Sequence, residues 1–157
     1  PAVRDALCAM GREGRVVIAD SRERIGMFQD VIIKPNEVEA ARAIGAELPP
    51  EQMAAQLHAI TRAPVVLTLG EKGSLLLENG DITRVPAVPV APPIDICGAG
   101  DAYLAALACA LAAGAGLAQA ARLGALAASV TIKKLNQTGT ATPGEILAAV
   151  KESEASA

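Results

Sequence analysis

The sequence predicts an α/β fold in which a mostly parallel sheet is flanked by helices. Short apolar runs alternate with helical patterns along the chain, which is the arrangement typical of parallel sheets covered by helices. The run "APVVLTLG" at 63–70 is continuously apolar, as in strands buried on both faces. With 157 residues, of which 52% are hydrophobic, the chain is long enough for one domain with a sizeable core.

The first half of the chain is expected to contain three strands and three helices. Glycines separate the opening helix from the first strand, and Pro35 forces a turn after the second strand because proline cannot continue the ladder. We predict an opening helix, strands at Arg15–Ala19 and Val31–Lys34, helices from about Asn36 and near Pro50–Thr61, and a strand at 63–70.

The second half is expected to open with a hairpin and to be helical after it. In "GSLLLENGDITRVP" the turn falls at Asn79-Gly80 or at Gly80-Asp81. The segment "AVPVAPPID" is too rich in proline to be helical. We predict helices at Gly98–Ala113 and Leu117–Lys133, a polar loop "LNQTGTATP", a last helix with Pro143 in its first turn, and a loose tail at Glu152–Ala157.

Composition excludes several functions. The net charge is −3, whereas binding to nucleic acid or to an anionic membrane requires a basic face. The apolar region 102–132 is interrupted by glycines and polar residues, so we expect two packed helices and no membrane span. Three cysteines and one histidine disfavour a zinc site and suit reduced thiols in the cytoplasm. Cys97 and Cys109 are expected to be packing residues, and His58 to lie on a helix surface.

The stretch "DICGAGDAYLAALACALAAG" places nearly bare backbone at the head of a helix. The first amides of a helix have no intrahelical acceptor and carry the positive end of the helix dipole. Gly98, Ala99 and Gly100 would let an anion approach these amides, and Asp101 would lie beside it as a base. This combination suits phosphoryl transfer to an alcohol. Alternatively, Asp101 only complements the helix dipole.

Two other phosphate motifs do not fit. Tyr103 stands where a dinucleotide fold needs a third small residue, and no Gly-Lys-Ser/Thr sequence is present. Instead, "DICGAGD" resembles the second signature of the PfkB (ribokinase-like) carbohydrate kinases, although Ile96 replaces the usual Thr. "KPNEVEA", "VVLTLGEKGSLLL" and "VTIKKLNQTGTATP" resemble further motifs of that family, in the same order.

The resemblance implies a role for each matching residue. Asp101 would be the catalytic base, and Gly98, Ala99 and Gly100 the anion hole for the γ-phosphoryl group. Asn36 and Glu39 would organise the phosphates and a water-coordinated Mg²⁺; the alternative is that they form only a capping box. ATP would be held by Thr68, Gly70, Gly73, Asn136 and Gly139, and a monovalent cation such as K⁺ by the backbone carbonyls of Asp95 and Cys97 with the Gly139 region.

By the same resemblance, 1–157 is the C-terminal nucleotide-binding and catalytic portion of a ribokinase-like three-layer fold whose N-terminal part and lid are missing. We expect phosphorylation of a small sugar or sugar phosphate, and a homodimer or pairing with the missing half. A non-catalytic nucleotide-binding fragment and a nucleoside or vitamin kinase remain open. The segment from Ile18 to Ala40 resembles the heptose-7-phosphate kinase branch. There, Arg22 and Arg24 would meet a substrate phosphate, or simply be solvated.

Overall fold

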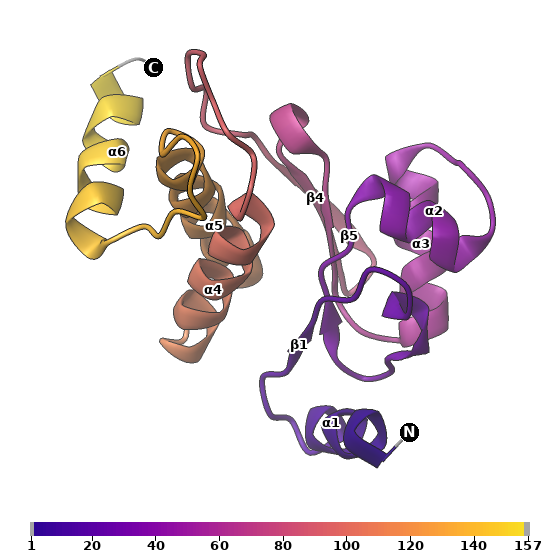
Figure 1. The fold of residues 1–157 in the computed structure, drawn as a ribbon. Helices are drawn as coiled ribbons and strands as arrows, with labels where there is room; N and C mark the ends of the chain where they lie inside the picture. Colours follow the sequence, from indigo (N-terminus) through magenta and orange to yellow (C-terminus); the bar gives the residue numbers. More distant parts are fainter. Residues whose placement is uncertain (1, 156–157) are drawn as a thin grey trace. The chain divides into compact units, whose positions relative to one another are not determined.

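The computed structural model describes residues 2–155, and these divide into two compact units (Figure 1). The first unit comprises the chain up to Gly70 together with Ser74–Val85, and the second comprises Glu71–Gly73 and the chain from Pro86 onward. Each unit is described by itself.

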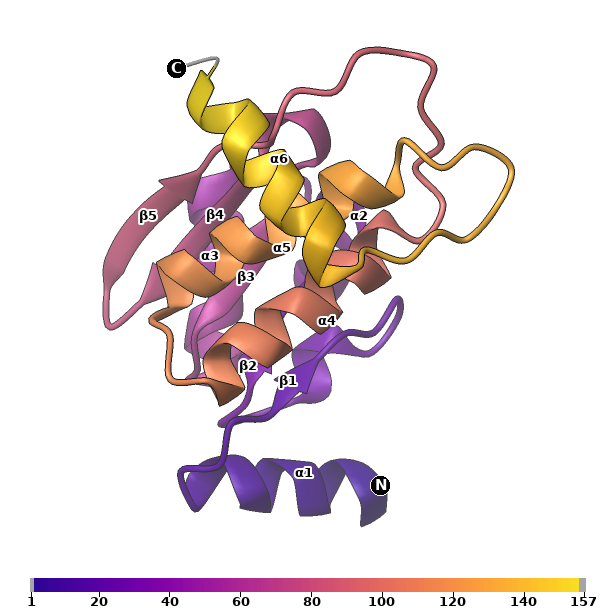
Figure 2. The ribbon, with the colours of Figure 1, turned by 90° about the vertical axis from the view of Figure 1, so that its left-hand side faces the viewer.

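The first unit is built on a five-stranded sheet whose strands lie side by side in chain order. The first three strands are parallel to one another, and the last two form an antiparallel hairpin on the third (Figure 2). The sheet therefore combines parallel strands with the expected hairpin. The strands are β1 (Ile18–Ala19), β2 (Ile32–Ile33), β3 (Val65–Thr68), β4 (Ser74–Glu78) and β5 (Asp81–Val85).

The hairpin turn is formed by Asn79 and Gly80, the first of the two placements that the sequence allowed. Glu78 pairs with Asp81 across the turn. The turn residues have φ of 54° and 90°, and such positive values at both central positions match the right-handed twist of the flanking strands.

The first two strands are shorter than predicted. Within the described part of the chain, β1 pairs only with β2, through Ile18 with Ile32 and Ala19 with Ile33, so the predicted spans Arg15–Ala19 and Val31–Lys34 are wrong at their ends. An apolar run reports burial, whereas the length of a ladder depends on how far a partner strand runs alongside.

Helices α2 (Glu37–Ile44) and α3 (Pro50–Thr61) pack on this sheet and enclose the core of the first unit. Pro50 lies in the first turn of α3, where its missing N–H costs no hydrogen bond. The fully buried side chains include Leu57 from α3 and Leu67 and Leu75 from the sheet. Burying one such side chain contributes about 1.5–3 kcal/mol.

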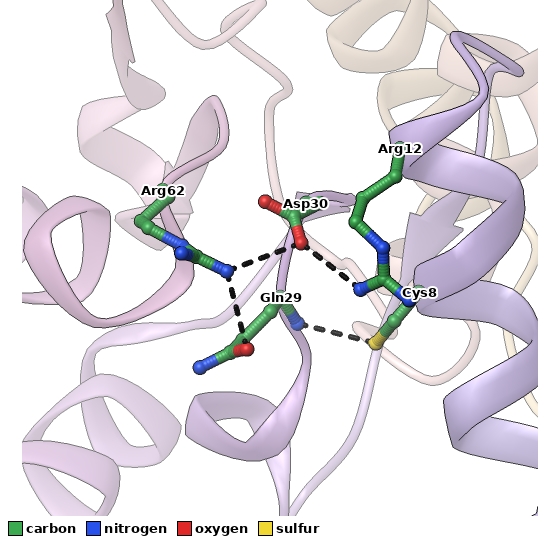
Figure 3. Close-up of polar contacts among 5 residues, drawn as sticks. All are labelled: Cys8, Arg12, Gln29, Asp30 and Arg62. Atoms are coloured by element: carbon green, nitrogen blue, oxygen red, sulfur yellow. Dashed lines mark hydrogen bonds and ion pairs between the residues drawn. The ribbon is translucent and has the colours of Figure 1, made fainter.

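Helix α1 (Ala2–Arg12) is joined to the amino end of β2 by an ion-pair cluster (Figure 3). The Asp30 carboxylate accepts hydrogen bonds from the guanidinium groups of Arg12 and Arg62, each at 3.3 Å. Both arginine side chains are more than half exposed, so each ion pair contributes at most about 1 kcal/mol.

Close backbone packing also joins α1 to the residues before β2. A Cβ at Gly11 would stand 1.9 Å from the carbonyl oxygen of Asp30, so only glycine fits there. Beside it, the Sγ of buried Cys8 accepts a hydrogen bond from the Gln29 N–H at 3.3 Å (Figure 3). Gly11 is therefore the residue on which the docking of α1 depends.

The second unit consists of α4 (Ala99–Ala112), α5 (Leu117–Thr131) and α6 (Pro143–Ala155). Helices α4 and α5 pack closely because α5 has Gly124 where α4 has Tyr103: a Cβ there would lie 2.9 Å from the tyrosine ring. The predicted loose tail is wrong as far as Ala155, since α6 continues to that residue; residues 156–157 lie outside the described part of the chain. Among the described residues, no helix is long and apolar enough to span a membrane.

Three side chains lie in surroundings that the sequence did not predict. Cys97 and Cys109 are exposed and are not packing residues. Helix α4 is apolar on all sides, so its pattern cannot show which face is buried; that face carries Tyr103 and Leu107. His58 is half-buried at the end of α3, with Nδ1 2.8 Å from the Ala63 carbonyl oxygen. Because a carbonyl only accepts hydrogen bonds, Nδ1 carries the proton.

Candidate active site

Helix α4 begins at the Gly-Ala-Gly turn, as the sequence predicted. Gly98 is the residue before the helix and has φ of 79°, a left-handed conformation that favours glycine. A Cβ at Gly98 would also lie 2.9 Å from Cγ2 of Thr138. Asp101 lies exposed in the first turn of α4. The structure therefore places an exposed carboxylate next to backbone N–H groups at the start of α4, and the residues that carry these N–H groups have almost no side chain.

The Asp95 carboxylate clamps the segment before α4 to the segment after α5. Its Oδ1 accepts the N–H of Cys97 at 3.0 Å, and its Oδ2 accepts the N–H of Asn136 at 3.1 Å. The Asp95 N–H in turn donates to the carbonyl of Ile132 at 2.9 Å. The resemblance gave a role only to the backbone carbonyl of Asp95, so the role of its side chain was missed. The sequence held a signal for it, because an Asp side chain often accepts the backbone N–H two residues further on and so forms a turn.

The loop after α5 is fastened to the start of α6 by Lys134. Its ammonium lies 2.8 Å from Oε1 of Glu145 and donates to the carbonyl of Thr140. Hydrogen bonds from Lys134, and then from the N–H and hydroxyl of Thr142, lower the pKa of Glu145 to about 2. Sequence reasoning missed this contact, yet Thr142 and Glu145 have the spacing of a capping box, which could have revealed it.

Gly139 lies within this fastened loop. A Cβ there would approach the side chain of Lys134 to 3.0 Å and the carbonyl oxygen of Thr131 to 3.2 Å. From Pro86 onward, the second unit contains eight of the predicted site residues: Asp95, Cys97, Gly98, Ala99, Gly100, Asp101, Asn136 and Gly139. Asp95 links the turn before α4 to the segment after α5, in which Asn136 and Gly139 lie.

In the first unit, Asn36 and Glu39 form a capping box at the start of α2. The Glu39 N–H donates to Asn36 Oδ1, and the Asn36 N–H donates to Glu39 Oε2, both at 2.9 Å. This confirms the structural alternative, while a role in binding Mg²⁺ stays a prediction. Thr68 lies next to this cap, because its N–H and its hydroxyl both donate to the Pro35 carbonyl, at 2.9 and 3.2 Å.

The segment after Thr68 is a tight turn between β3 and β4. Gly70 and Gly73 have φ of 59° and 88°, which explains the two glycines. Apart from Gly70 itself and its chain neighbours, no described residue has a heavy atom within 4 Å of the position of a Cβ on Gly70. The turn thus exposes backbone at the carboxyl end of β3, which is the edge where α/β sheets bind ligands.

An ion pair between a buried lysine and a partly exposed aspartate at the same edge of the sheet was not predicted. Lys34, at the end of β2, is 3% exposed, and its ammonium lies 2.7 Å from Oδ2 of Asp20 at the end of β1. The next residues form a surface loop, in which Arg22 and Arg24 are exposed and the Arg22 carbonyl accepts a hydrogen bond from Arg42 at 2.7 Å.

Neither a cluster of metal-binding side chains nor the hollow over α2 marks the predicted site in the described part of the chain. Among residues 2–155, no three or more His, Cys, Asp or Glu side chains gather in a way that could hold a metal ion. An open hollow of about 800 Å³ lies over α2 and the loop after it, lined in part by Val38 and Arg42, and includes none of the predicted site residues.

Two curated relatives cover most of this chain. The "Bifunctional protein HldE" of Trichlorobacter lovleyi is 40% identical over 124 residues, which are 75% of this chain and 25% of that protein. The protein of the same name from Caulobacter vibrioides is 34% identical over 161 residues, covering 97% of this chain and 33% of its own length. The chain thus spans a quarter to a third of the length of these relatives.

Solved structures share the fold over about half of their length. An Arabidopsis thaliana ribokinase, complexed with ribose and ATP, superimposes with a TM-score of 0.80 and 27% identity over 94% of this chain and 51% of that one. Phosphofructokinase-2 from Escherichia coli, in complex with potassium, gives a TM-score of 0.81 at 22% identity, over 97% and 52%. Residues 25–143, moreover, match the family described as "pfkB family carbohydrate kinase". The chain belongs to this family.

Proposed function

We propose that the protein containing this chain transfers the γ-phosphoryl group of ATP to a hydroxyl of a sugar or sugar phosphate. The observation that carries the proposal is the start of α4, where exposed Asp101 follows a Gly98 turn whose amides bear almost no side chains. Asp101 would take the proton of the acceptor hydroxyl as its oxygen bonds to phosphorus, and ADP would leave. The amides at 98–100 would hold the oxygens of the transferring group.

We infer that two segments contribute to nucleotide binding. Thr68, Gly70 and Gly73 offer exposed backbone at the carboxyl end of β3, and Asn136 and Gly139 lie in the loop fastened to α6.

Glu39 is suited to bind Mg²⁺ through water although it caps α2. A carboxylate has about four lone-pair sites, and the cap uses Oε2 for one N–H. The other oxygen is left to accept from water in the shell of a Mg²⁺ ion, which keeps several of its waters when bound to phosphates. Mg²⁺ would supply charge neutralisation of the β- and γ-phosphates.

The acceptor that we favour is heptose 7-phosphate. The segment around Arg22 and Arg24 resembles the heptose-7-phosphate kinase branch, and both arginines lie exposed after β1. A guanidinium group suits a phosphate because it donates two parallel hydrogen bonds. All three cysteines are free thiols, which fits a protein of the cytoplasm.

The test is the Asp101→Asn variant of the purified protein, assayed for ADP release with Mg-ATP, K⁺ and a panel of sugars, sugar phosphates, nucleosides and vitamin alcohols. Loss of a general base should lower kcat by about 10²–10⁴-fold, while Mg-ATP binding measured by calorimetry persists. Asp81→Asn, which changes an exposed carboxylate in the hairpin, is the matched control. Unchanged turnover in Asp101→Asn would refute the mechanism, and Mg-ATP binding without turnover in the unaltered protein would favour a non-catalytic nucleotide-binding module.

A further inference from the structure

Asp20 is a partly exposed carboxylate that a buried lysine holds at the end of β1. The Lys34 ammonium lies 2.7 Å from Asp20 Oδ2, and the two side chains are 4% and 25% exposed. A buried ammonium needs such a partner, so the ion pair fixes the orientation of the carboxylate. Among residues 2–155, no donor is bound to the other oxygen, Oδ1. Asp20 therefore presents one fixed oxygen that can accept a hydrogen bond from a bound group.

The residues after Asp20 form a loop that is held by its backbone and leaves two guanidinium groups exposed. Ser21 Oγ accepts the N–H of Arg24 at 3.1 Å, and the Arg22 carbonyl accepts a hydrogen bond from Arg42 of α2 at 2.7 Å. The side chains of Arg22 and Arg24 are exposed, and neither pairs with Asp20 or with any other carboxylate of the described residues. These two cations are therefore available to a ligand.

The chemistry of these groups defines the ligand that they fit. A guanidinium group donates hydrogen bonds and suits a phosphate. A carboxylate only accepts hydrogen bonds, so it suits a hydroxyl and repels an anion. Two arginines that follow a fixed carboxylate by two and four residues therefore match a molecule that carries both hydroxyls and a phosphate. A sugar phosphate has this combination.

The position of Asp20 in the sheet favours the acceptor over the nucleotide. Asp20 follows β1, whereas the predicted nucleotide segment begins at Thr68, at the end of β3. Strand β2 lies between β1 and β3, and neighbouring strands are about 4.8 Å apart, so the two strand ends are separated by about 10 Å. The carboxylate would also repel the polyphosphate of ATP. The acceptor is therefore the better match for Asp20.

We propose that Asp20 is a specificity-determining residue whose free oxygen accepts a hydrogen bond from a hydroxyl of the sugar-phosphate acceptor. Lys34 is the positioning residue that aims this oxygen, and Arg22 and Arg24 contact the phosphate of the same molecule. The inference rests on the proposed kinase function, in which only the two arginines were assigned to the acceptor. Asp20 takes no part in the proton transfer.

The experiment measures the binding of heptose 7-phosphate to the full-length protein by calorimetry, without nucleotide. In Asp20→Asn, the Lys34 ammonium takes the one remaining oxygen, and an NH₂ group replaces the oxygen that accepts the hydroxyl. Loss of this charge-assisted hydrogen bond should raise the Kd for heptose 7-phosphate by about tenfold or more. The Kd for Mg-ATP should stay unchanged.

Monodeoxy analogues of heptose 7-phosphate separate a contact with the acceptor from a merely structural role. One analogue lacks the hydroxyl that Asp20 binds, and Asp20→Asn should bind that analogue no more weakly than the unaltered protein does. The other analogues should keep the difference between the two proteins. A structural role would instead weaken the binding of all analogues alike.

Two further variants complete the test. Glu23→Gln makes the same charge change at an exposed position of the same loop and should leave the Kd for heptose 7-phosphate unchanged. If Asp20→Asn fails to fold because Lys34 loses its partner, Asp20→Asn with Lys34→Met removes both charges and gives the same comparison. An unchanged Kd, an equal loss for every analogue, or no binding of heptose 7-phosphate to the unaltered protein would overturn the inference.

The outcome is independent of the proposed chemistry, because binding is measured without ATP. If Asp101→Asn leaves turnover unchanged while Asp20→Asn weakens the binding of heptose 7-phosphate, the mechanism fails and the acceptor contact stands. If Asp101→Asn abolishes turnover while Asp20→Asn binds heptose 7-phosphate normally, the mechanism stands and the acceptor contact fails.

Discussion

The Gly98→Ala variant tests whether the turn before α4 is held in shape by its surroundings. Two costs can be worked out from the structure. At φ of 79°, an alanine adopts the left-handed conformation at a cost of about 1–2 kcal/mol. Its Cβ would also lie 2.9 Å from Cγ2 of Thr138, well inside the usual separation of about 3.5–4.0 Å between carbons, so Thr138 must shift. Forcing a side chain off its rotamer adds about 0.5–1.5 kcal/mol.

The assay is urea unfolding followed by far-UV circular dichroism, with Gly114→Ala as the matched control. Gly114 follows the other end of α4 and has a similar φ of 89°, but, its chain neighbours aside, no described residue approaches its Cβ position within 4 Å. Gly114→Ala should therefore show the backbone cost alone, about 1–2 kcal/mol. Gly98→Ala should lower the free energy of unfolding by more than Gly114→Ala does. Adding Thr138→Ser, which removes the obstructing methyl group, should restore the difference between the two variants. Equal destabilisation by the two glycine variants would refute the reasoning.

Three further predictions concern contacts outside this turn. Gly124→Ala should destabilise by about 1–3 kcal/mol through its contact with the Tyr103 ring, although alanine favours helix by about 1 kcal/mol; a more stable variant in urea unfolding would contradict this. Gly11→Ala should lower the free energy of unfolding by about 3 kcal/mol or more, because the atom in the way is the backbone oxygen of Asp30. Amide hydrogen exchange in α1 should become faster. Unchanged exchange in α1 would show that the docking of this helix does not depend on Gly11. The Glu145 pKa is lowered from 4.5 to about 2 in the folded protein, so its stabilising effect is present above pH 4.5 and is lost as the pH falls towards 2; Glu145→Gln should flatten the pH dependence of Tm in that window, and an unaltered profile would exclude the contribution.

Local sequence signals were sufficient where the structure depends on nearby residues. Helix α3 has the predicted bounds Pro50–Thr61, the hairpin turn falls at Asn79-Gly80, and α4 starts at the glycine turn. Caps, prolines and left-handed glycines act within a few residues of the chain, so the sequence around them predicts their effect.

The errors arose where burial or pairing depends on distant residues. Cys109 was expected in the core because α4 is apolar on every side, and only packing against α5 decides which face is buried. The length of β1 was overestimated because it depends on pairing with β2, which follows the 3-10 helix at Ile25–Met27.

The sequence by itself determined the α/β class, the family and the residues at the head of α4, because these follow from hydrophobic pattern and from motifs of adjacent residues. Tertiary structure alone decided that Asp95 clamps a loop 41 residues away, that Lys34 is buried against Asp20, and that the Thr131 hydroxyl has no partner among residues 2–155. A local pattern specifies which groups are polar. Whether a polar group is satisfied depends on which distant part of the chain folds against it.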